Sequence, residues 1–345
     1  MKYNMSERYA RQELFYGIGK EGQKKLTGKK VAIIGCGALG CTSANLMVRS
    51  GVGCVKIIDR DFIEECNLQR QTLFDEDDIS NNLPKAIAAK KKLQKINSNI
   101  TIEATVAEIN PSNIDSNLHD TDLIIDGTDN FETRFLINDY CVKNAIPWIY
   151  GACIGSIGIT MSIIPGVTPC LRCALQDIPT FGSTETCDTA GILSPASGII
   201  ASIQAAEALK ILTDNVAAVN RYLLKFDLWK NEITRLKIHN LREINICKTC
   251  KSNQFEYLKM GKYSATTTLC GRNAVQIVPV NGSNINLPML ASRLKPIGNV
   301  SFNKYMLRLE TDKYVVTVFP DSRVIITGTN DLPTAKSIYA KYIGM

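Results

Sequence analysis

A glycine-rich turn between two apolar runs constrains the fold of this chain more than any other feature. The β-branched run at 31–34 leads directly into GCGALG at 35–40, and a helical pattern of small residues follows. A second apolar run at 55–58 ends on Asp59. This order predicts a strand, a loop, a helix and a second strand, which is the context in which a G-x-G-x-x-G pattern binds a nucleotide.

Each part of this unit has a physical role in the predicted nucleotide site. Gly35 permits a tight turn, Gly37 allows phosphate to approach the backbone, and Gly40 lets the helix pack closely on the strand. Free N–H groups at the helix N-terminus favour phosphates, and Asp59 can accept hydrogen bonds from a ribose. A glycine-rich turn without a ligand is the alternative, and this unit alone does not identify the nucleotide.

The apolar runs that follow predict a Rossmann-like, doubly wound and mostly parallel sheet. Residues 60–83 lack clean periodicity, and a loop of that length in a compact domain tends to be functional. Ligands of such sheets sit at the carboxyl ends of the strands, so Asp59 and Asp129 can face one site. Strands are expected at 100–106, 122–125, 148–153, 158–164, 222–228 and 234–238, and helices at 84–96, 131–144 and 194–212.

At 345 residues the chain can form one large α/β domain and a smaller one. Polar residues 251–262 are interpreted as a linker, which predicts a nucleotide-binding domain at 1–255 and a small α+β domain at 263–345. The smaller domain is expected to contain strands at 274–280, 305–309, 314–319 and 323–328, and helices at 287–294 and 332–343.

Composition restricts the compartment and the partners. The N-terminal segment MKYNMSERYARQ has no apolar stretch of signal-peptide type, and the chain contains no run of about 18 apolar residues. We therefore expect a cytoplasmic protein that does not contact a membrane. The net charge is +7, but no basic stripe is interleaved with aromatic residues, so nucleic acid is not an expected partner.

Twelve cysteines in such a compartment indicate metal ligation, catalysis or burial rather than a disulfide framework. Two CxxC pairs, Cys170 with Cys173 and Cys247 with Cys250, can form a tetrahedral zinc site. Four thiolates close the coordination sphere, so this zinc would be structural; free or redox-active thiols are the alternative. Further cysteines lie in apolar patterns and are expected to be buried, at positions 36, 41, 54, 141, 153 and 270.

Polar side chains beyond the loop point to a nucleoside triphosphate. A dehydrogenase needs no clamp of Arg and Lys, whereas a triphosphate needs its charge neutralised when a nucleophile attacks. Asp129 suits Mg²⁺, which takes one or two carboxylates together with phosphate oxygens. Taken singly, each residue is also explained as a cap, a surface ion pair or a loop amide. The set comprises Asn67, Gln69, Arg70, Gln71, Lys85, Asp129 and Asn130.

In this order, ERYARQ, GCGALG, NLQRQTLF, PKA, GTDN, PCLRC, CDTAG and CKTC strongly resemble the ThiF/MoeB/HesA family, the bacterial relatives of the ubiquitin-activating enzymes. The resemblance covers residues 5–250. It implies ATP-dependent adenylation of the C-terminal glycine of a ubiquitin-like sulfur-carrier protein of the ThiS or MoaD type, with release of pyrophosphate, in thiamine or molybdopterin biosynthesis. It also implies Mg²⁺, structural Zn²⁺ on the four cysteines, a sulfur donor of the cysteine desulfurase or rhodanese type, and a homodimer.

The resemblance also implies roles for individual residues. Arg11 would reach into the site of a second copy, and Asp59 would hold the ribose. Asn67, Arg70 and Lys85 would contact the phosphates, and Asp129 would serve Mg²⁺. Two positions depart from the common family pattern, because Ala38 replaces a frequent glycine and Cys66 replaces a serine. The remaining nucleotide-binding residues implied are Gly35, Gly37, Ala38, Gly40, Asp61, Gln69 and Asn130.

Cys187 has two possible assignments. The matching cysteine of the ThiF branch bonds to the carrier through sulfur, whereas the MoeB branch works without it. The acidic neighbours Glu185 and Asp188 disfavour a thiolate, so activation would have to come from elsewhere. Cys187 is therefore either a catalytic nucleophile or a tolerated loop residue.

Other interpretations stay open at this point. An NAD-dependent oxidoreductase uses the same glycine loop, a relative of this family adenylates a peptide, and a scaffold can keep the fold without activity. The Arg and Lys clamp argues against the first, and the lack of an N-terminal peptide-clamp domain argues against the second. Residues 263–345 are expected to dock the carrier or a sulfur donor, and Trp229 is expected to pack internally.

Overall fold

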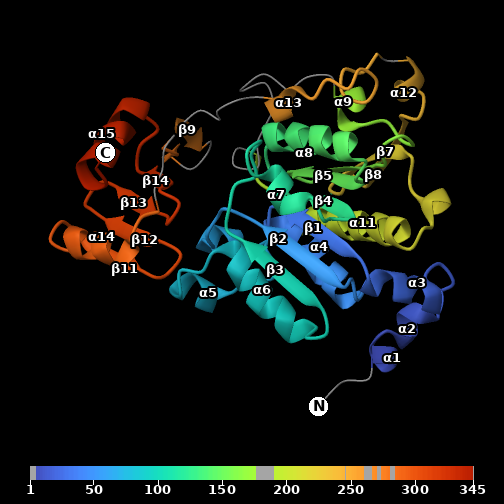
Figure 1. The fold of residues 1–345 in the computed structure, drawn as a ribbon, viewed down its shortest axis with the longest axis horizontal. Coiled ribbons are helices and arrows are strands. Elements are labelled where there is room, and N and C mark those ends of the chain that lie inside the picture. The colour runs from blue at the N-terminus through green and yellow to red at the C-terminus, as the bar shows by residue number, and fades with distance from the viewer. Residues whose placement is uncertain are drawn as a thin grey trace. The chain divides into compact units, whose positions relative to one another are not determined.

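The computed structural model describes residues 5–175, 190–244, 246–259, 266–269, 273–279 and 284–344. By their contacts these residues divide into two compact units, bounded as Met1–Met260 and Gly261–Met345. Figure 1 shows the elements of both units in ribbon form. Within the described residues, no helix is both long enough and apolar enough to cross a membrane.

The larger unit is built on an eight-stranded sheet with the order β3-β2-β1-β4-β5-β6-β7-β8. The first five of these strands run parallel, and β6, β7 and β8 continue the sheet antiparallel. The predicted Rossmann-like, mostly parallel sheet is confirmed. Its strands are β1 (Lys30–Ile34), β2 (Cys54–Ile58), β3 (Thr101–Thr105), β4 (Leu123–Asp126), β5 (Trp148–Ile154), β6 (Ile157–Ile163), β7 (Tyr222–Asp227) and β8 (Glu232–Lys237).

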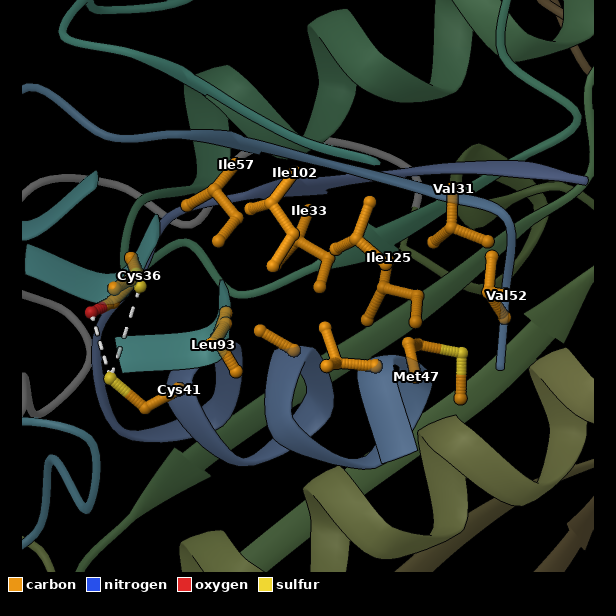
Figure 2. Packing of buried hydrophobic residues seen from close by; sticks show 14 of the residues in the cluster. Val31, Ile33, Cys36, Cys41, Met47, Val52, Ile57, Leu93, Ile102 and Ile125 are labelled. Carbon is orange, nitrogen blue, oxygen red and sulfur yellow. Dashed lines mark hydrogen bonds between the residues drawn. The ribbon is translucent and has the colours of Figure 1, made fainter. Parts of the chain in front are cut away.

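Helices cover both faces of the parallel part of the sheet, which is why its inner strands are apolar along their whole length. Val31 and Ile33 of β1 pack into one core cluster with side chains of α4, α6 and α11, whereas Ala32 and Ile34 pack into another with α7 and α8. Figure 2 shows the first cluster, in which Met47 of α4 lies opposite the strand side chains. These helices are α4 (Ala38–Arg49), α6 (Lys85–Ile96), α7 (Ile114–Leu118), α8 (Phe131–Asn144) and α11 (Ser194–Leu212).

Two buried thiols face each other where α4 begins. The sulfur atoms of Cys36 and Cys41 are 3.9 Å apart, and both side chains are fully buried (Figure 2). The hydrogen bond with Cys41, together with burial, raises the pKa of the Cys36 thiol well above its ordinary value. Burial is confirmed for Cys36, Cys41, Cys54, Cys141 and Cys153, whereas Cys270 lies outside the described residues.

The stretch 60–83, predicted to lack regular structure, contains two short helical segments, η1 (Glu65–Asn67) and α5 (Glu76–Ser80). α5 begins with a reciprocal cap: Asp78 N donates to Asp75 Oδ1 at 3.2 Å, and Asp75 N donates to Asp78 Oδ2 at 3.0 Å. This capping box uses Asp at both ends, whereas the usual sequence signal is Ser or Thr followed by Glu or Gln. The acidic run was therefore not recognised as a helix start.

Short helices complete the larger unit. The N-terminal ones pack at the end of α4 that lies away from the glycine loop, where the side-chain amides of Gln12 and Gln23 donate to Ser50 O at 2.9 and 3.0 Å. They are α1 (Met5–Arg8), α2 (Ala10–Glu13) and α3 (Gly19–Thr27), and the connecting ones are α9 (Leu171–Ala174), η2 (Val216–Ala218), α12 (Leu241–Ile244) and α13 (Glu256–Lys259).

The smaller unit is a six-stranded antiparallel sheet with the order β11-β12-β13-β14-β10-β9. Two helices pack on one of its faces and close an apolar core of its own, which includes Leu290, Leu309, Val316 and Ile338. The elements are β9 (Thr266–Leu269), β10 (Ala274–Ile277), α14 (Leu287–Leu294), β11 (Asn299–Phe302), β12 (Leu307–Glu310), β13 (Val315–Val318), β14 (Val324–Thr327) and α15 (Leu332–Tyr342).

Three features differ from the sequence expectations. The strands β9 and β11 were not predicted: TTTL shows no apolar and polar alternation, and NVSF alternates over only four residues, which is too short a pattern to identify a strand. Trp229 was expected to pack internally, which is wrong: it lies in the turn between β7 and β8 and is 78% exposed. Ile233 of the neighbouring β8 is 74% exposed, so this hairpin presents apolar side chains to solvent.

Candidate active site

The carboxyl ends of three adjacent strands meet at the glycine loop. Ile34 of β1 pairs with Ile58 of β2 on one side and with Asp126 of β4 on the other. Gly35, Asp59 and Gly127 each follow one of these paired residues, so all three lie at the same edge of the sheet. This register brings together the glycine loop, Asp59 and the segment that carries Asp129, as the topology of a doubly wound sheet predicts.

Two of the loop glycines are sterically required. Gly35 has a φ of +85°, and a Cβ there would lie 2.5 Å from Gly127 O. A Cβ on Gly40 would lie 1.9 Å from Gly35 O. At Gly37, by contrast, the nearest atom to such a Cβ is Gln71 Nε2, at 3.9 Å. The space above Gly37 is thus the part of the loop where a phosphate group can approach the backbone.

Asp59 holds the glycine loop in place. Its carboxylate accepts hydrogen bonds from Cys36 N at 2.5 Å and from Asp61 N at 2.6 Å. Burial raises the pKa of Asp59, and the nearby Lys85 ammonium opposes this shift. Each carboxylate oxygen has a second lone pair, so the group can still accept from a ribose hydroxyl.

Lys85 reaches this edge from the first turn of α6. Its side chain is 4% exposed, and its Nζ lies 3.3 Å from Asp61 Oδ2. The backbone is fixed as well, because Lys85 N donates to Asp61 O at 2.9 Å and Phe62 forms a bridge with Pro84. A buried ammonium held beside two carboxylates is suited to neutralising phosphate charge.

The segment 64–71, which carries three amide side chains and one guanidinium, approaches the glycine loop at Gln71. Asn67 is buried and accepts from Glu64 N through Oδ1 at 3.2 Å, while Arg70 donates from Nη1 to Cys66 O at 2.8 Å. Gln69 is exposed. Gln71 is buried, and within the described part of the chain its Oε1 has no hydrogen-bond partner. An unpaired buried oxygen next to the open side of Gly37 is expected where a ligand supplies the donor.

A buried ion pair supports the turn that carries Asp129. Asp126 Oδ2 lies 3.1 Å from Arg134 Nε, and the two side chains are 0% and 6% exposed. Asp126 Oδ1 accepts from Thr128 N at 2.9 Å and from Thr128 Oγ1 at 2.7 Å, while Arg134 Nη2 donates to Thr128 O at 2.6 Å and to Gly151 O at 3.1 Å. Burial raises the pKa of Asp126, and the Arg134 guanidinium opposes the shift.

Asp129 itself is exposed at the end of this turn. The next residue, Asn130, caps α8, because its Oδ1 accepts from Thr133 N at 2.8 Å. Gln204 of α11 also holds this turn, since its Nε2 donates a hydrogen bond to Asp126 O at 2.8 Å. Neither Arg134 nor Gln204 was identified from the sequence; the only available signal was an arginine four residues after a helix-capping asparagine.

Arg11 does not belong to the site of its own chain. It is exposed on α2, whose neighbouring Gln12 is bonded to Ser50 at the C-terminal end of α4. α4 has 12 residues. A helix of this length measures about 18 Å, and the glycine loop lies at its other end. Cys187, which lies within 176–189, is outside the described residues.

The four cysteines of the two CxxC pairs converge on one point. Their sulfur atoms lie within 4.8 Å of one another, with Cys170–Cys173, Cys170–Cys247 and Cys173–Cys250 separations of 3.8, 3.6 and 3.4 Å. Tetrahedral zinc with Zn–S bonds of about 2.3 Å places sulfurs about 3.8 Å apart. The hydrogen bond with Cys173 raises the pKa of Cys170, and the hydrogen bond with Cys170 lowers the pKa of Cys247. The donor set fits a closed metal site.

The second CxxC pair is tied to the main sheet through α8. Asp139 accepts from Thr249 Oγ1 and from Tyr257 N, both at 2.9 Å. Thr249 is fully buried between Cys247 and Cys250. Burial raises the pKa of Asp139 to about 6. The four-cysteine cluster and these hydrogen bonds thus join the end of the larger unit to its middle, as the cysteine spacing predicted.

The fold and the site together define a Rossmann-like protein of the nucleotide-binding class with a four-cysteine cluster suited to a metal ion. The chain belongs to the ThiF family, whose model matches residues 9–249. It is 45% identical over 99% of its length to the whole "Sulfur carrier protein ThiS adenylyltransferase" of Bacillus subtilis. It is 31% identical to the "Sulfur carrier protein adenylyltransferase" of Thermus thermophilus, over 70% of this chain and 90% of that protein.

Solved structures show the same architecture. A crystal structure of E. coli MccB with ATP matches with a TM-score of 0.61 and 25% identity, over 72% of this chain and 75% of that chain. Another, of MccB with MccA-N7isoASN, gives a TM-score of 0.62 at 25% identity, over 72% and 76% of the two chains. The predicted family is confirmed.

The two loop glycines give a matched pair of alanine variants. Gly40→Ala must displace the Gly35 carbonyl, so we expect a stability loss of about 1–3 kcal/mol, the usual cost of overpacking. Gly37→Ala has room and a φ of −81°, so its melting temperature should stay that of the native chain, while ATP affinity falls because the methyl group occupies the phosphate side. Thermal unfolding and calorimetric titration with ATP measure both effects. Equal losses of stability in Gly40→Ala and Gly37→Ala would contradict this geometry, and so would an unchanged ATP affinity in Gly37→Ala.

Removing Arg134 should leave a buried carboxylate without its counter-charge. We expect Arg134→Met to lose about 3–5 kcal/mol of unfolding free energy at pH 7.5. The pKa of Asp126 is already raised by burial and rises further without the cation, so the loss should shrink as pH falls and the carboxyl group takes up a proton. Urea unfolding at pH 7.5 and 5.5 tests this. Asp126→Asn combined with Arg134→Met should be more stable than Arg134→Met alone; the reverse order would show that the ion pair is not the cause.

Proposed function

We propose that this chain uses ATP to adenylate the C-terminal glycine of a ubiquitin-like sulfur-carrier protein and releases pyrophosphate. The observation that carries the proposal is the 45% identity over nearly the whole chain to a protein named as a ThiS adenylyltransferase. The geometry supports it, because a phosphate-accessible glycine loop, a buried lysine and an exposed aspartate share one edge of the sheet.

The proposed reaction needs charge neutralisation rather than a general base. The carrier's terminal carboxylate is ionised at pH 7 and attacks the α-phosphorus, and the bond to pyrophosphate breaks. Lys85 and Arg70 would offset the negative charge of the phosphates, together with the N–H groups at the start of α4. Asp59 and Gln71 are the groups that would orient the ribose and its neighbouring phosphate.

Asp129 is the residue that would hold Mg²⁺, because it is the exposed carboxylate at the end of β4. A bound Mg²⁺ would neutralise phosphate oxygens during the attack. Asn130 follows it directly and caps α8 through Oδ1, which leaves its amide nitrogen and a second lone pair on the oxygen for a ligand. Asp61 acts through Lys85, which it positions.

Arg11 supports a homodimer. It lies at the far end of α4 from its own glycine loop, and the exposed side chains of Leu14, Phe15 and Tyr16 follow it directly. A role for Arg11 in adenylation therefore requires a second copy of the chain. Exposed apolar side chains next to a cation are suited to such an interface.

The carrier would dock beside the same edge of the sheet. The turn after β7 is bonded to the turn after β5, since Leu228 N donates to Ser156 O at 2.9 Å. The exposed Trp229 and Ile233 therefore belong to the hairpin that begins at the same edge of the sheet as the site, which supports docking there. A ThiS-type carrier is proposed first and a MoaD-type carrier second, with a cysteine desulfurase or rhodanese-type protein as sulfur donor and Cys187 as the residue that would accept the carrier. None of the ten described cysteines forms a disulfide, which fits a reducing cytoplasm.

ATP–pyrophosphate exchange in the presence of each purified carrier tests the proposal. We expect carrier-dependent exchange, reduced at least a hundredfold in Lys85→Met and in Asp129→Asn because phosphate charge is no longer offset. Lys91→Met on the same helix and Asp77→Asn on α5 are exposed controls and should keep native exchange. Tight NADH binding without exchange would instead support the oxidoreductase interpretation.

The four-cysteine cluster is proposed to bind structural zinc. We expect one zinc ion per purified chain by elemental analysis. Cys250→Ser should lose the metal and more than about 5 °C of melting temperature, equivalent to about 2 kcal/mol for a unit of this size. Cys66→Ser, at an exposed cysteine outside the cluster, is the control and should keep both. Full zinc content in Cys250→Ser would overturn this assignment.

A further inference from the structure

The smaller unit carries nearly all of the net positive charge. Residues 261–345 contain ten Lys and Arg against four Asp and Glu, in a chain whose total net charge is +7. The asymmetry is strongest in the first part of the unit, since 261–309 contain six basic residues and no acidic one. Net charge of one sign on a small unit favours partners of the opposite sign.

Among the residues of this unit that the structure describes, no strand pairs with the outer edge of β11, and this edge is not protected in the usual ways. β11 is an edge strand and contains neither proline nor a charged residue, which are the common means of blocking strand addition. Asn303 N donates to Met306 O at 2.9 Å in the turn to β12. Because hydrogen bonding alternates along antiparallel strands, the backbone N–H and C=O groups of Val300 and Phe302 point away from β12.

Apolar side chains lie beside this open edge. Phe302 of β11 is 46% exposed, Ile297 just before the strand is 48% exposed, and Met289 of α14 is 76% exposed. α14 and β11 lie side by side at the same edge of the unit (Figure 1). An extended peptide added to β11 would therefore find backbone partners and an apolar surface together.

Exposed lysines flank the edge at both ends. Lys295 ends α14 four residues before β11, and Lys304 lies in the turn that follows the strand. Arg308 on the neighbouring β12 is paired with Glu310 at 3.0 Å. The two lysines thus supply the charge at the open edge itself.

We propose that β11 binds an extended acidic segment of a partner protein as a seventh strand of the smaller unit's sheet. Adenylation alone does not call for this surface. The Thermus relative is named as a sulfur-carrier adenylyltransferase, and 90% of it is matched by 70% of this chain, which leaves no room for a second unit of this size. A peptide is favoured over nucleic acid because the open N–H and C=O groups pair with a peptide backbone.

Fluorescence anisotropy with the full chain tests this surface. The probe is a labelled, end-blocked heptapeptide of alternating valine and glutamate, and the same peptide with lysine for glutamate is its control. We expect saturable binding of the acidic peptide only, weakened at least tenfold by the double variant Lys295→Glu with Lys304→Glu. Phe302→Ala should weaken binding about fivefold. Lys336→Glu, an exposed charge reversal on α15, should change it less than twofold.

Several outcomes would overturn the proposal: no saturable binding of the acidic peptide, an equal effect of Lys336→Glu, or displacement of the peptide by a single-stranded RNA at lower concentration than by unlabelled peptide. ATP–pyrophosphate exchange should be unchanged in all these variants, because they lie outside the larger unit. Loss of exchange in the native chain would reject the adenylation proposal and leave this one standing.

Discussion

Contact between two backbone turns holds the candidate active site together. Gly35 and Gly127 follow neighbouring strands, and each leaves no space for a side chain on the other. Because the turns touch directly, the helix start at Ala38 and the exposed Asp129 are placed at one edge of the sheet without a long connecting loop. The charged residues that complete the site enter from the segment between β2 and α6.

A buried ion pair also helps to fix the turn that follows β4. Asp126 and Arg134 are both removed from solvent. Asp126 accepts hydrogen bonds from the backbone N–H and the hydroxyl of Thr128, and Arg134 donates to the Thr128 carbonyl. Charge buried in this way is costly unless it is fully bonded, so it fixes one conformation of the turn rather than adding net stability. The exposed carboxylate of Asp129 depends on that fixed conformation.

Much of this could be predicted from the sequence, and the exceptions have physical reasons. The glycine loop, Asp59 and the CxxC pairs were identified because their chemistry depends on short spacings within single segments. The support from Arg134 and Gln204 was not, because a buried polar side chain on a helix looks like a solvated one until its neighbours are known. The edge strand β11 was missed because its alternating pattern spans only four residues, too few to separate a strand from a loop. That Arg11 lies far from the glycine loop of its own chain could be seen only from the packing of α2 against the C-terminal end of α4.

The thiols of Cys36 and Cys41 sit inside the nucleotide loop, 3.9 Å apart and closed off from solvent. Oxidants and persulfides attack thiolates that solvent can reach. Both sulfurs are buried, and the hydrogen bond with Cys41 together with burial raises the pKa of Cys36. The loop that faces the nucleotide therefore presents no reactive thiol at its surface, and an oxidant would have to open the packing around α4 to modify it.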